Sequence, residues 1–276
     1  MAYDNFKPTI LAANILTEKQ KLTTFATECN TSYRGEAKLG RTVQINDIGR
    51  PKIGKYIPGT AIDDPEVVAG NNVLLKIDQA DYFNYMLDDV DEAQAQGDIM
   101  KALAIGSARA LAEAEDYFIA KECATKGTVK VEGGTIGTAK AMKIAIDNAF
   151  ETLWSNSVTH KDDVTMFLPP WAYNLFKDQL VELKTDNDGL LAKGVLGTYN
   201  NAKIKLTNNL YVDGGMDHII IKTKESFGYV SGLDKVEPYR PEKHFADAVR
   251  GIHTYGGVIV RPKELVVLTA KKGTNA

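Results

Sequence analysis

One long segment restricts the fold of this chain more than any other feature: a run of strong helix formers over residues 99–127. It reads IMKALAIGSARALAEAEDYFIAKECATKG and is dominated by alanine, leucine, lysine and glutamate. Acidic residues precede it, where the helix dipole favours negative charge, and Gly127 supplies a stop. Counted from Asp91 the helix would be about 35 residues long, or roughly 50 Å, although Gly97 could delay its start to Asp98. A helix of this length crosses a whole domain.

The apolar residues of this helix recur at helical spacing, which predicts that one face packs against a sheet. Several of them are alanines, whose small side chains allow a close approach. The predicted buried stripe consists of Ile99, Leu103, Ala110, Ala114 and Phe118. We therefore expect a sheet to lie along most of the helix.

Two strands are predicted upstream of the helix, on either side of a long loop. In TVQINDIG, Val43 and Ile45 share one face and polar residues share the other, which is the alternation of a half-exposed strand. The second strand, NNVLLKID, covers residues 71–78. The loop between them is rich in proline and glycine, and loops of this length inside a compact domain are usually functional or disordered. The flanking strands predict a long, protruding hairpin.

The loop of this hairpin carries apolar side chains that an isolated finger could not bury. Exposed apolar groups of this kind are typical of a surface that contacts a partner. They are Ile53, Tyr56, Ile57, Val67 and Val68.

The first 41 residues are polar and weakly patterned. A short helix is possible, because Thr17 and Gln20 have capping-box spacing, and it would carry Leu22, Phe25 and Ala26. We expect this region to form an arm and to contribute nothing to the core.

After residue 128 the pattern changes to alternating helices and strands, which predicts a second, α+β subdomain. Thr138 can cap an amphipathic helix that continues to Trp154, VTMFLPP is typical of a buried strand, and Pro170 opens a further helix through Leu183. The segments KIKLT, HIIIKT, FGYVSGL, GGVIVRP and ELVVLTA are typical of strands.

The composition excludes several classes of protein. With 276 residues, 44% of them hydrophobic and 25% charged, the chain is globular, and its net charge of −3 gives no basic field for nucleic acid or an anionic membrane. No apolar run approaches the roughly 20 residues needed to span a bilayer, and the start lacks a signal-peptide pattern, so we expect a soluble cytosolic product. Cys29 and Cys123 lie outside any C-x-x-C pattern and are expected to be reduced structural thiols.

The motifs that could carry catalysis are incomplete. GGTIGTAK lacks the terminal G-K-[ST] of a phosphate-binding loop, and TDNDG fails as a calcium loop because Lys184 falls on the first ligand position. GYVSG places Ser231 one position late for a nucleophile elbow. The four histidines lie in separate segments without metal-binding spacing. We therefore predict no catalytic residue, no cofactor and no metal site.

The order of the parts is the most informative feature: polar arm, long hairpin, very long alanine-rich helix, α+β subdomain and terminal strands. In this order the chain resembles the major capsid proteins of tailed bacteriophages with the Hong Kong 97-type fold. RTVQINDIGRPKIGKYIPGT through NVLLKIDQADYFNYMLDDVDEA is similar to the family's E-loop running into its spine helix. FADAVRGIHTYGGVIVRPKELVVL is similar to its last peripheral-domain strands. The resemblance covers nearly the whole chain.

The resemblance implies an α+β, Hong Kong 97-like capsid fold with five parts along the chain. These parts are an N-terminal arm at 1–41, an E-loop hairpin at 42–78, a peripheral domain with the spine helix at 79–130, an axial domain at 131–235 and a C-terminal return to the peripheral domain at 236–276.

The resemblance also implies a shell subunit that is not an enzyme. The family's subunits assemble as hexamers and pentamers into an icosahedral virion capsid in the host bacterial cytoplasm, with scaffold and portal proteins as partners. Such a shell encloses double-stranded DNA without sequence-specific binding and without a membrane. Two alternatives stay open: an encapsulin-type nanocompartment shell, which shares the fold, and a soluble enzyme with its site at the GGTIGTAK turn of the α+β subdomain.

The stretch GIHTYGGVIVRP, residues 251–262, has two interpretations when taken alone. It could be a catalytic loop with His253 as a base, or a bend in a sheet. The resemblance implies the second, in which Gly256 and Gly257 relieve a bend or bulge, His253 and Tyr255 are strand side chains, and Pro262 ends the pairing.

The family's E-loop is expected to lie over an adjacent subunit, and charge suggests how. The hairpin tip is basic with apolar residues between the charges, whereas the approach to the spine helix is acidic. A hairpin that extends away from the body would hold these two sets apart within one chain, so we expect them to meet between subunits. The alternatives are solvated charge on both surfaces, or a cation or paired acids at the acidic set. The predicted subunit-contact residues are Arg50, Lys52, Ile53, Lys55, Tyr56, Asp88, Asp89, Asp91 and Glu92.

Overall fold

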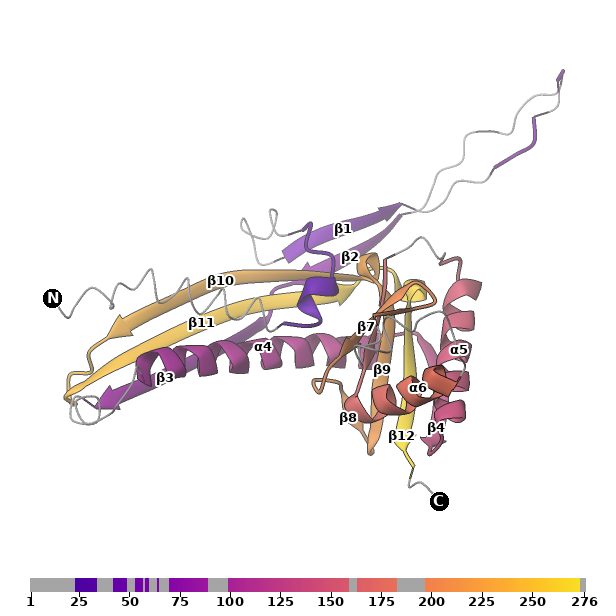
Figure 1. The fold of residues 1–276 in the computed structure, drawn as a ribbon. Helices are drawn as coiled ribbons and strands as arrows, with labels where there is room; N and C mark the ends of the chain where they lie inside the picture. The colour runs from indigo at the N-terminus through magenta and orange to yellow at the C-terminus, as the bar shows by residue number, and fades with distance from the viewer. Residues whose placement is uncertain are drawn as a thin grey trace.

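The structure, a computed structural model, describes residues 23–33, 42–48, 53–56, 58–59, 64, 70–88, 99–158, 163–182 and 197–273. These residues form a long helix, α4, that lies along a three-stranded sheet and ends beside a seven-stranded sheet (Figure 1). A separate two-stranded hairpin stands on the opposite side of the three-stranded sheet. The observed architecture is α+β, as predicted.

The long helix spans Ile99–Lys126, which is 28 residues or roughly 42 Å. The two predicted starts, Asp91 and Asp98, lie outside the described part of the chain, so both stay predictions. Its end is the predicted one. The Gly127 amide donates to the Cys123 carbonyl at 2.9 Å. A Cβ at position 127 would lie 2.4 Å from that oxygen, so the stop requires glycine.

The three-stranded sheet is antiparallel in the order β10-β11-β3. Its strands are β3 Gln79–Asp88, β10 Phe227–Tyr239 and β11 Ala246–Ile259. Ala104 and Ala108 of α4 pack against Phe83 and Val236 of this sheet, where alanine allows the helix to approach closely. The predicted sheet along the helix is therefore present, but no strand was predicted over residues 79–88.

The predicted buried stripe of α4 has the wrong register. Ala110 is exposed, Leu103, Ala114 and Phe118 are only half-buried, and the side chain of Ile99 lies outside the described residues. The helix is so rich in alanine that its faces differ little in hydrophobicity, and its buried face includes two acidic residues that no apolar pattern could reveal. The buried face consists of Ala104, Ala108, Leu111, Ala112, Glu115, Asp116, Ile119, Ala120, Cys123 and Ala124.

The seven-stranded sheet has the order β4-β12-β9-β5-β7-β6. Strand β8 pairs with the first two residues of β9, Met216 and Asp217. It combines parallel pairs, such as β4 with β12, and antiparallel pairs, such as β12 with β9. Its strands are β4 Val129–Ile136, β5 Val164–Leu168, β6 Thr198–Tyr199, β7 Ala202–Leu206, β8 Val212–Asp213, β9 Met216–Thr223 and β12 Leu265–Lys272.

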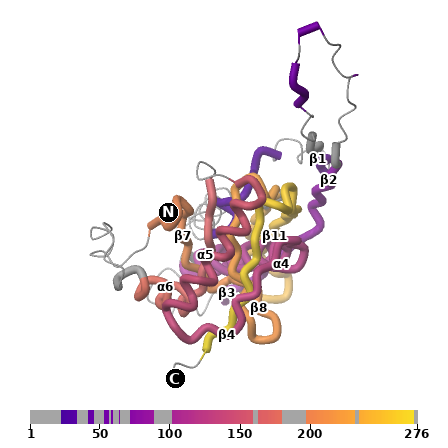
Figure 2. Tube along the Cα trace, turned by 90° about the vertical axis from the view of Figure 1, so that its right-hand side faces the viewer, coloured from indigo at the N-terminus to yellow at the C-terminus, as the bar shows by residue number. Residues whose placement is uncertain are grey.

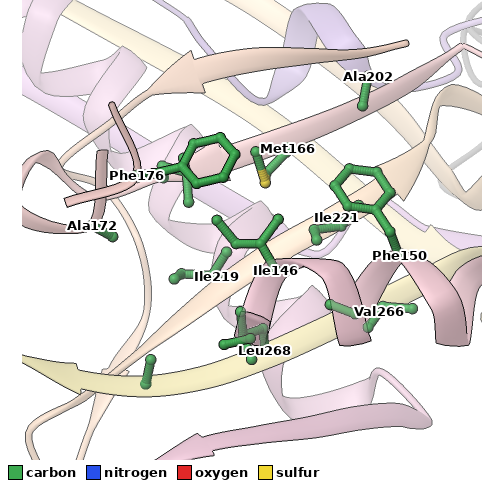
Figure 3. Close-up of a cluster of buried hydrophobic side chains, with 14 of the residues drawn as sticks. Ile146, Phe150, Met166, Ala172, Phe176, Ala202, Ile219, Ile221, Val266 and Leu268 are labelled. Atoms are coloured by element: carbon green, nitrogen blue, oxygen red, sulfur yellow. The ribbon is translucent and has the colours of Figure 1, made fainter. Parts of the chain in front are cut away.

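Two helices, α5 Ala139–Ser155 and α6 Pro170–Glu182, cover one face of this sheet (Figure 2). Both were predicted. The Thr138 hydroxyl caps α5 by accepting from the Ala141 amide at 3.3 Å. Ile146 and Phe150 of α5 pack against Met166, Ile221 and Leu268 of three strands (Figure 3).

The other face of the seven-stranded sheet packs on the end of α4. All five residues of β5 are buried, because α5 and α6 cover one of its faces and the segment around Phe25 covers the other, which explains why VTMFL does not alternate between apolar and polar residues. The second core cluster brings Phe167, Ile220 and Val267 of the sheet against Ile119 and Cys123 of α4.

The hairpin stem is formed as predicted. Strand β1 Thr42–Ile48 pairs antiparallel with β2 Gly70–Lys76, with Thr42 opposite Lys76 and Ile48 opposite Gly70. Val43 and Ile45 are buried, together with Leu75, against Val230 and Val260 of the main body.

The expectation that residues 1–41 contribute nothing to the core is wrong for its described part. Phe25 and Cys29 are fully buried and Ala26 is nearly so, within the second core cluster. Ala26–Glu28 form one turn of 3-10 helix. The predicted capping box at Thr17 and Gln20 lies outside the described residues.

The predicted C-terminal boundary also needs correction. Residue 235 lies inside β10, so a division there cuts a continuous strand. Strand β12 does not return to the three-stranded sheet with β10 and β11, because it pairs with β4 and β9 inside the seven-stranded sheet. The part that returns is therefore β10 and β11 alone. Among the described residues no helix has both the length and the apolarity to cross a membrane.

Candidate subunit interface

The hairpin segment beyond β1 exposes apolar side chains. Ile53 is 97% exposed and Tyr56 is 73% exposed, and Lys55 between them is exposed as well. Arg50 and Lys52 lie outside the described residues. Two large apolar side chains left in water on a projecting segment are typical of a contact surface.

Of the predicted acidic set, the structure describes Asp88, which is exposed at the end of β3. Its backbone pairs with Ala246, so it is the last residue of a strand that precedes the long helix. Asp89, Asp91 and Glu92 lie outside the described residues. Figure 1 places the end of β3 and the far end of the hairpin at opposite ends of the molecule, so the described members of the two sets do not meet within one chain.

The face of the three-stranded sheet that points away from α4, here called the outer sheet face, carries a second exposed apolar group. Because side chains alternate along a strand, Phe83 and Tyr85 point toward the helix while Tyr82 and Met86 point away. Tyr82 is 78% exposed, and its ladder partner Ile252 is also exposed. The outer sheet face consists of Tyr82, Asn84, Met86, Asp88, Lys235, Glu237, Tyr239, Arg250 and Ile252.

Charged groups border the apolar part of this face. The Arg250 Nη2 donates to Glu237 Oε2 at 3.0 Å, and Lys235 pairs with the same carboxylate. The bonds from Lys235 and Arg250 hold the pKa of the Glu237 carboxyl below its usual range. The Tyr239 hydroxyl donates to Asn84 Oδ1 at 3.0 Å and joins the two edge strands. The network keeps the polar side chains in one arrangement around the apolar centre.

A shallow depression of about 200 Å³ lies in the middle of the outer sheet face. Its lining is Tyr82, Phe83, Asn84, Lys235, Glu237, Arg250, Gly251 and Ile252. Gly251 serves the opposite face of the sheet, where a Cβ would lie 2.4 Å from the Phe83 ring that packs toward α4. The surface thus offers apolar contact area with a charged border, and sequence reasoning missed it because both faces of residues 79–88 carry large side chains.

The stretch 251–262 belongs to β11 and the turn that follows it. The His253 side chain is 2% exposed, with its Nε2 3.3 Å from Glu115 Oε2, so it is a buried strand side chain that a substrate could not reach. The Tyr255 hydroxyl donates to the Asp81 carboxylate at 2.5 Å, and burial together with Asp81 raises the pKa of Tyr255. The strand ends at Ile259, before Pro262, as predicted.

Of the bend or bulge predicted at Gly256 and Gly257, the bulge is wrong, because both glycines pair in register with β10. The irregularity lies in β10, between Ser231 and Asp234. Instead, the absence of a side chain at both glycines lets neighbouring parts of the chain approach β11 closely. A Cβ at Gly256 would lie 2.0 Å from the Lys76 carbonyl oxygen, where the chain leaves the hairpin, and one at Gly257 would lie 2.5 Å from the Phe227 ring.

The segments with partial motifs have structural roles where they are described. GGTIGTAK ends β4 and caps α5, and GYVSG lies within β10. TDNDG is outside the described residues. Cys29 and Cys123 are free and buried in one core cluster, although they are distant in sequence, and burial raises the pKa of both thiols. No group of three or more metal-ligating side chains occurs in the part of the chain that the structure describes.

Comparison with known proteins gives matches in structure but none in sequence. No protein-family model and no curated protein matches the chain. A structure from Mycobacterium phage Che8 is 27% identical and superposes with a TM-score of 0.76 over 89% of this chain and 90% of that one. The capsid structure of the cyanophage P-SCSP1u is 18% identical, with a TM-score of 0.69 over 91% and 89% of the two chains.

A virus-like particle from Pyrococcus furiosus also matches, at 15% identity and a TM-score of 0.62, over 94% of this chain and 98% of that one. The two phage structures are therefore more similar to this chain than the archaeal particle is, in both identity and superposition. The matches cover about nine-tenths or more of each chain. The chain therefore has the Hong Kong 97-type fold, which is the fold of the major capsid proteins of tailed bacteriophages.

Proposed function

We propose that this chain is a major capsid protein that self-assembles into the icosahedral shell of a tailed bacteriophage. The observation that carries the proposal is the match to the Mycobacterium phage Che8 structure, at a TM-score of 0.76 over 89% of this chain. The shell is built from hexamers and pentamers of the chain and encloses the double-stranded DNA genome. Scaffold and portal proteins are its partners during assembly in the host cytoplasm, and the finished shell is part of the virion.

The exposed apolar surfaces support an assembly function. A single chain that stayed alone would leave Ile53 and Tyr56 on the hairpin, and Tyr82 and Met86 on the outer sheet face, in contact with water. Each such group gains free energy when a neighbour covers it, at about 25 cal/mol per Å² of apolar area. Repetition of the contact around a closed shell multiplies that gain.

The hairpin of one subunit lies on the outer sheet face of its neighbour in this proposal. Ile53 and Tyr56 then supply the apolar contact, and the depression beside Tyr82 and Ile252 receives it. Asp88 points to the same side of β3 as Tyr82 and Met86, so the acidic end of the strand borders the apolar surface. The basic residues Arg50, Lys52 and Lys55 complement that acidic end, which continues in sequence as Asp89, Asp91 and Glu92.

An encapsulin-type shell is the second candidate, supported by the match to the Pyrococcus furiosus particle. The lower TM-score and identity make it the weaker of the two shell functions.

Electron microscopy of the purified protein, with light scattering, tests the proposal directly. A shell subunit forms closed particles of megadalton mass, whereas an enzyme would form a small oligomer. Particles whose interior holds nuclease-protected DNA identify the phage shell, and particles filled with a cargo protein identify the encapsulin alternative. Monomers or dimers alone, under every condition that permits assembly, would contradict both shell functions.

A further inference from the structure

Residues 23–33, here called the strap, lie in a socket where α4, the seven-stranded sheet and the three-stranded sheet meet. Phe25 and Cys29 are fully buried there. Figure 1 shows this indigo segment between the hairpin above it and α4 below it. The strap thus sits between elements that are far apart in the sequence.

The first contact of the strap is with α4. The Asp116 carboxylate accepts from the Thr24 amide at 2.8 Å and from the Phe25 amide at 2.9 Å. Asp116 is itself fully buried. One side chain of the long helix therefore holds the backbone of the strap through two charge-assisted hydrogen bonds, which are the stronger kind.

The second contact is with the seven-stranded sheet. Lys222 of β9 is fully buried, and its Nζ donates to the Glu28 carbonyl and lies 3.5 Å from Cys29 Sγ. The Phe25 ring stacks on Phe167 of β5, with centroids 3.9 Å apart and planes inclined by 14°. A buried cation and an aromatic face thus fix the middle of the strap.

The third contact is with the three-stranded sheet and the seat of the hairpin. The Asn30 amide donates to the Phe227 carbonyl at 3.0 Å, and the Tyr229 amide donates to the Asn30 carbonyl at 2.9 Å. Three residues on, Tyr33 packs against Gly228, where a Cβ would lie 3.2 Å from its ring. Tyr33 also packs against the cluster that seats the hairpin, which contains Val43, Ile45 and Leu75.

Two of these contacts involve buried charges whose partners are backbone groups of the strap. Asp116 is negative and binds amides, and Lys222 is positive and binds a carbonyl. If the strap left the socket, both charges would lose those partners in apolar surroundings, which is far more costly than the loss of an exposed bond. Partial seating is therefore unfavourable, and the strap and its socket behave as one cooperative unit.

We propose that the strap is a conformational coupling element: seated in its socket, it fixes the β1–β2 hairpin relative to α4. The path runs from Asp116 through residues 24–30 to Tyr33 and from there to the hairpin seat. Release of the Asp116 contact loosens the hairpin although no residue of the hairpin has changed. The coupling operates in the single chain before assembly, so it does not depend on the proposed function.

Amide hydrogen exchange on the full-length, unassembled chain tests the proposal, with Asp116→Asn as the variant. The substitution keeps the shape of the side chain but replaces one acceptor with an amide group that faces a donor. We expect exchange of residues 24–30 and of both hairpin strands to accelerate together, by at least about tenfold. Exchange in α5 and β5 should stay as in the wild type. Glu113→Gln, an exposed substitution on the same helix, is the matched control and should change neither region.

A second variant approaches the coupling from the strap. Phe25→Leu removes the stacking on Phe167 and leaves α4 intact, so it remains informative if Asp116→Asn fails to fold. Accelerated exchange in both the strap and the hairpin supports the coupling. Acceleration confined to the strap overturns it, because the hairpin would then be held independently. Unchanged exchange in both regions, in both variants, would also overturn it, since the strap would not depend on the contacts described.

Discussion

The imidazole Nε2 of His253 lies 3.3 Å from the Glu115 carboxylate, and both side chains are at least 97% buried. Glu115 belongs to α4 and His253 to β11, so this pair connects the long helix to the central strand of the sheet beneath it. The neighbouring residue in the helix, Asp116, binds the strap. Two consecutive acidic residues therefore hold different layers of the molecule.

Removal of either partner of the Glu115–His253 pair should destabilise the chain strongly. A buried polar partner left alone typically costs about 3–5 kcal/mol. We expect Glu115→Ala and His253→Ala each to lower the free energy of unfolding by an amount of this order, and the double variant to lose clearly less than the sum. Chemical denaturation of the unassembled chain measures all three. Simple additivity would show that the two side chains do not interact.

Asp116 should make stability depend on pH between about 4 and 6. Burial raises the pKa of this carboxyl to about 6, against the hydrogen bonds from Thr24 and Phe25, which lower it. The folded chain therefore binds the proton more tightly than the unfolded chain, whose aspartates have pKa values near 3.9. The contribution of Asp116 to the free energy of unfolding is most favourable below pH 4. It falls by about 3 kcal/mol as the pH rises through 6.

The difference in unfolding free energy between the wild type and Asp116→Asn isolates this effect from the other carboxyl groups. We expect the unfolding free energy of the wild type to fall relative to that of Asp116→Asn as the pH rises from 4 to 7. A difference that stays constant over this range would contradict the assignment of the titration to Asp116.

Gly256→Ala should disturb the seat of the hairpin. The new Cβ would lie 2.0 Å from the Lys76 carbonyl, and the contact is with backbone, which cannot rotate away. We expect a loss of about 1–3 kcal/mol in unfolding free energy, measured by denaturation. Gly106→Ala is the matched control. It lies in α4 with open space around it, and alanine there should add about 0.5–1 kcal/mol.

Reversal of charge at the hairpin tip should block assembly and leave the fold intact. We expect the triple variant to keep its circular dichroism spectrum but to form no shells, because repeated repulsion replaces contacts worth about 0–1 kcal/mol each. Basic residues at the acidic end of β3 should partly restore assembly. Normal shells from the triple variant would show that the hairpin docks by other means. The substitutions are Arg50→Glu, Lys52→Glu and Lys55→Glu, with Asp88→Lys, Asp89→Lys and Asp91→Lys as the compensating set.

Tyr82→Ser should separate assembly from folding at the outer sheet face. The side chain is 78% exposed, so its loss should change the unfolding free energy of the single chain by no more than about 0.5 kcal/mol. An aromatic residue at the centre of an interface commonly contributes about 2 kcal/mol or more. Light scattering should therefore show a raised critical concentration for assembly. Ile144→Ser, on α5 and half exposed, is the control, and equal assembly by both variants would argue against the outer sheet face as the contact.

The sequence predicts those elements whose signals are local. Thr138 and Pro170 mark the starts of α5 and α6, and Gly127 marks the end of α4, because caps and stops act within a few residues. The alternation of Val43 and Ile45 predicts β1, since one of its faces is exposed.

Other elements could not be predicted because their environment comes from distant parts of the chain. Strand β3 carries Tyr82 on one face and Phe83 on the other, so its pattern does not alternate in polarity. The strap is polar overall, and Phe25 is buried only because Asp116 and Lys222 satisfy the backbone around it. Of the predicted contact residues, the local apolar excess at Ile53 and Tyr56 was visible, whereas the outer sheet face required the pairing of three strands.

The position of β12 has a consequence for the order of events in the cell. This strand is the last of its sheet along the chain, yet it lies between β4 and β9, which precede it by more than forty residues. A ribosome that has not yet released residues 265–272 therefore carries a nascent chain whose seven-stranded sheet is split in two. Sheets whose neighbouring strands lie far apart in the sequence form slowly and late in folding. For the proposed shell function, we therefore expect nascent subunits to be unable to assemble until translation has passed this strand.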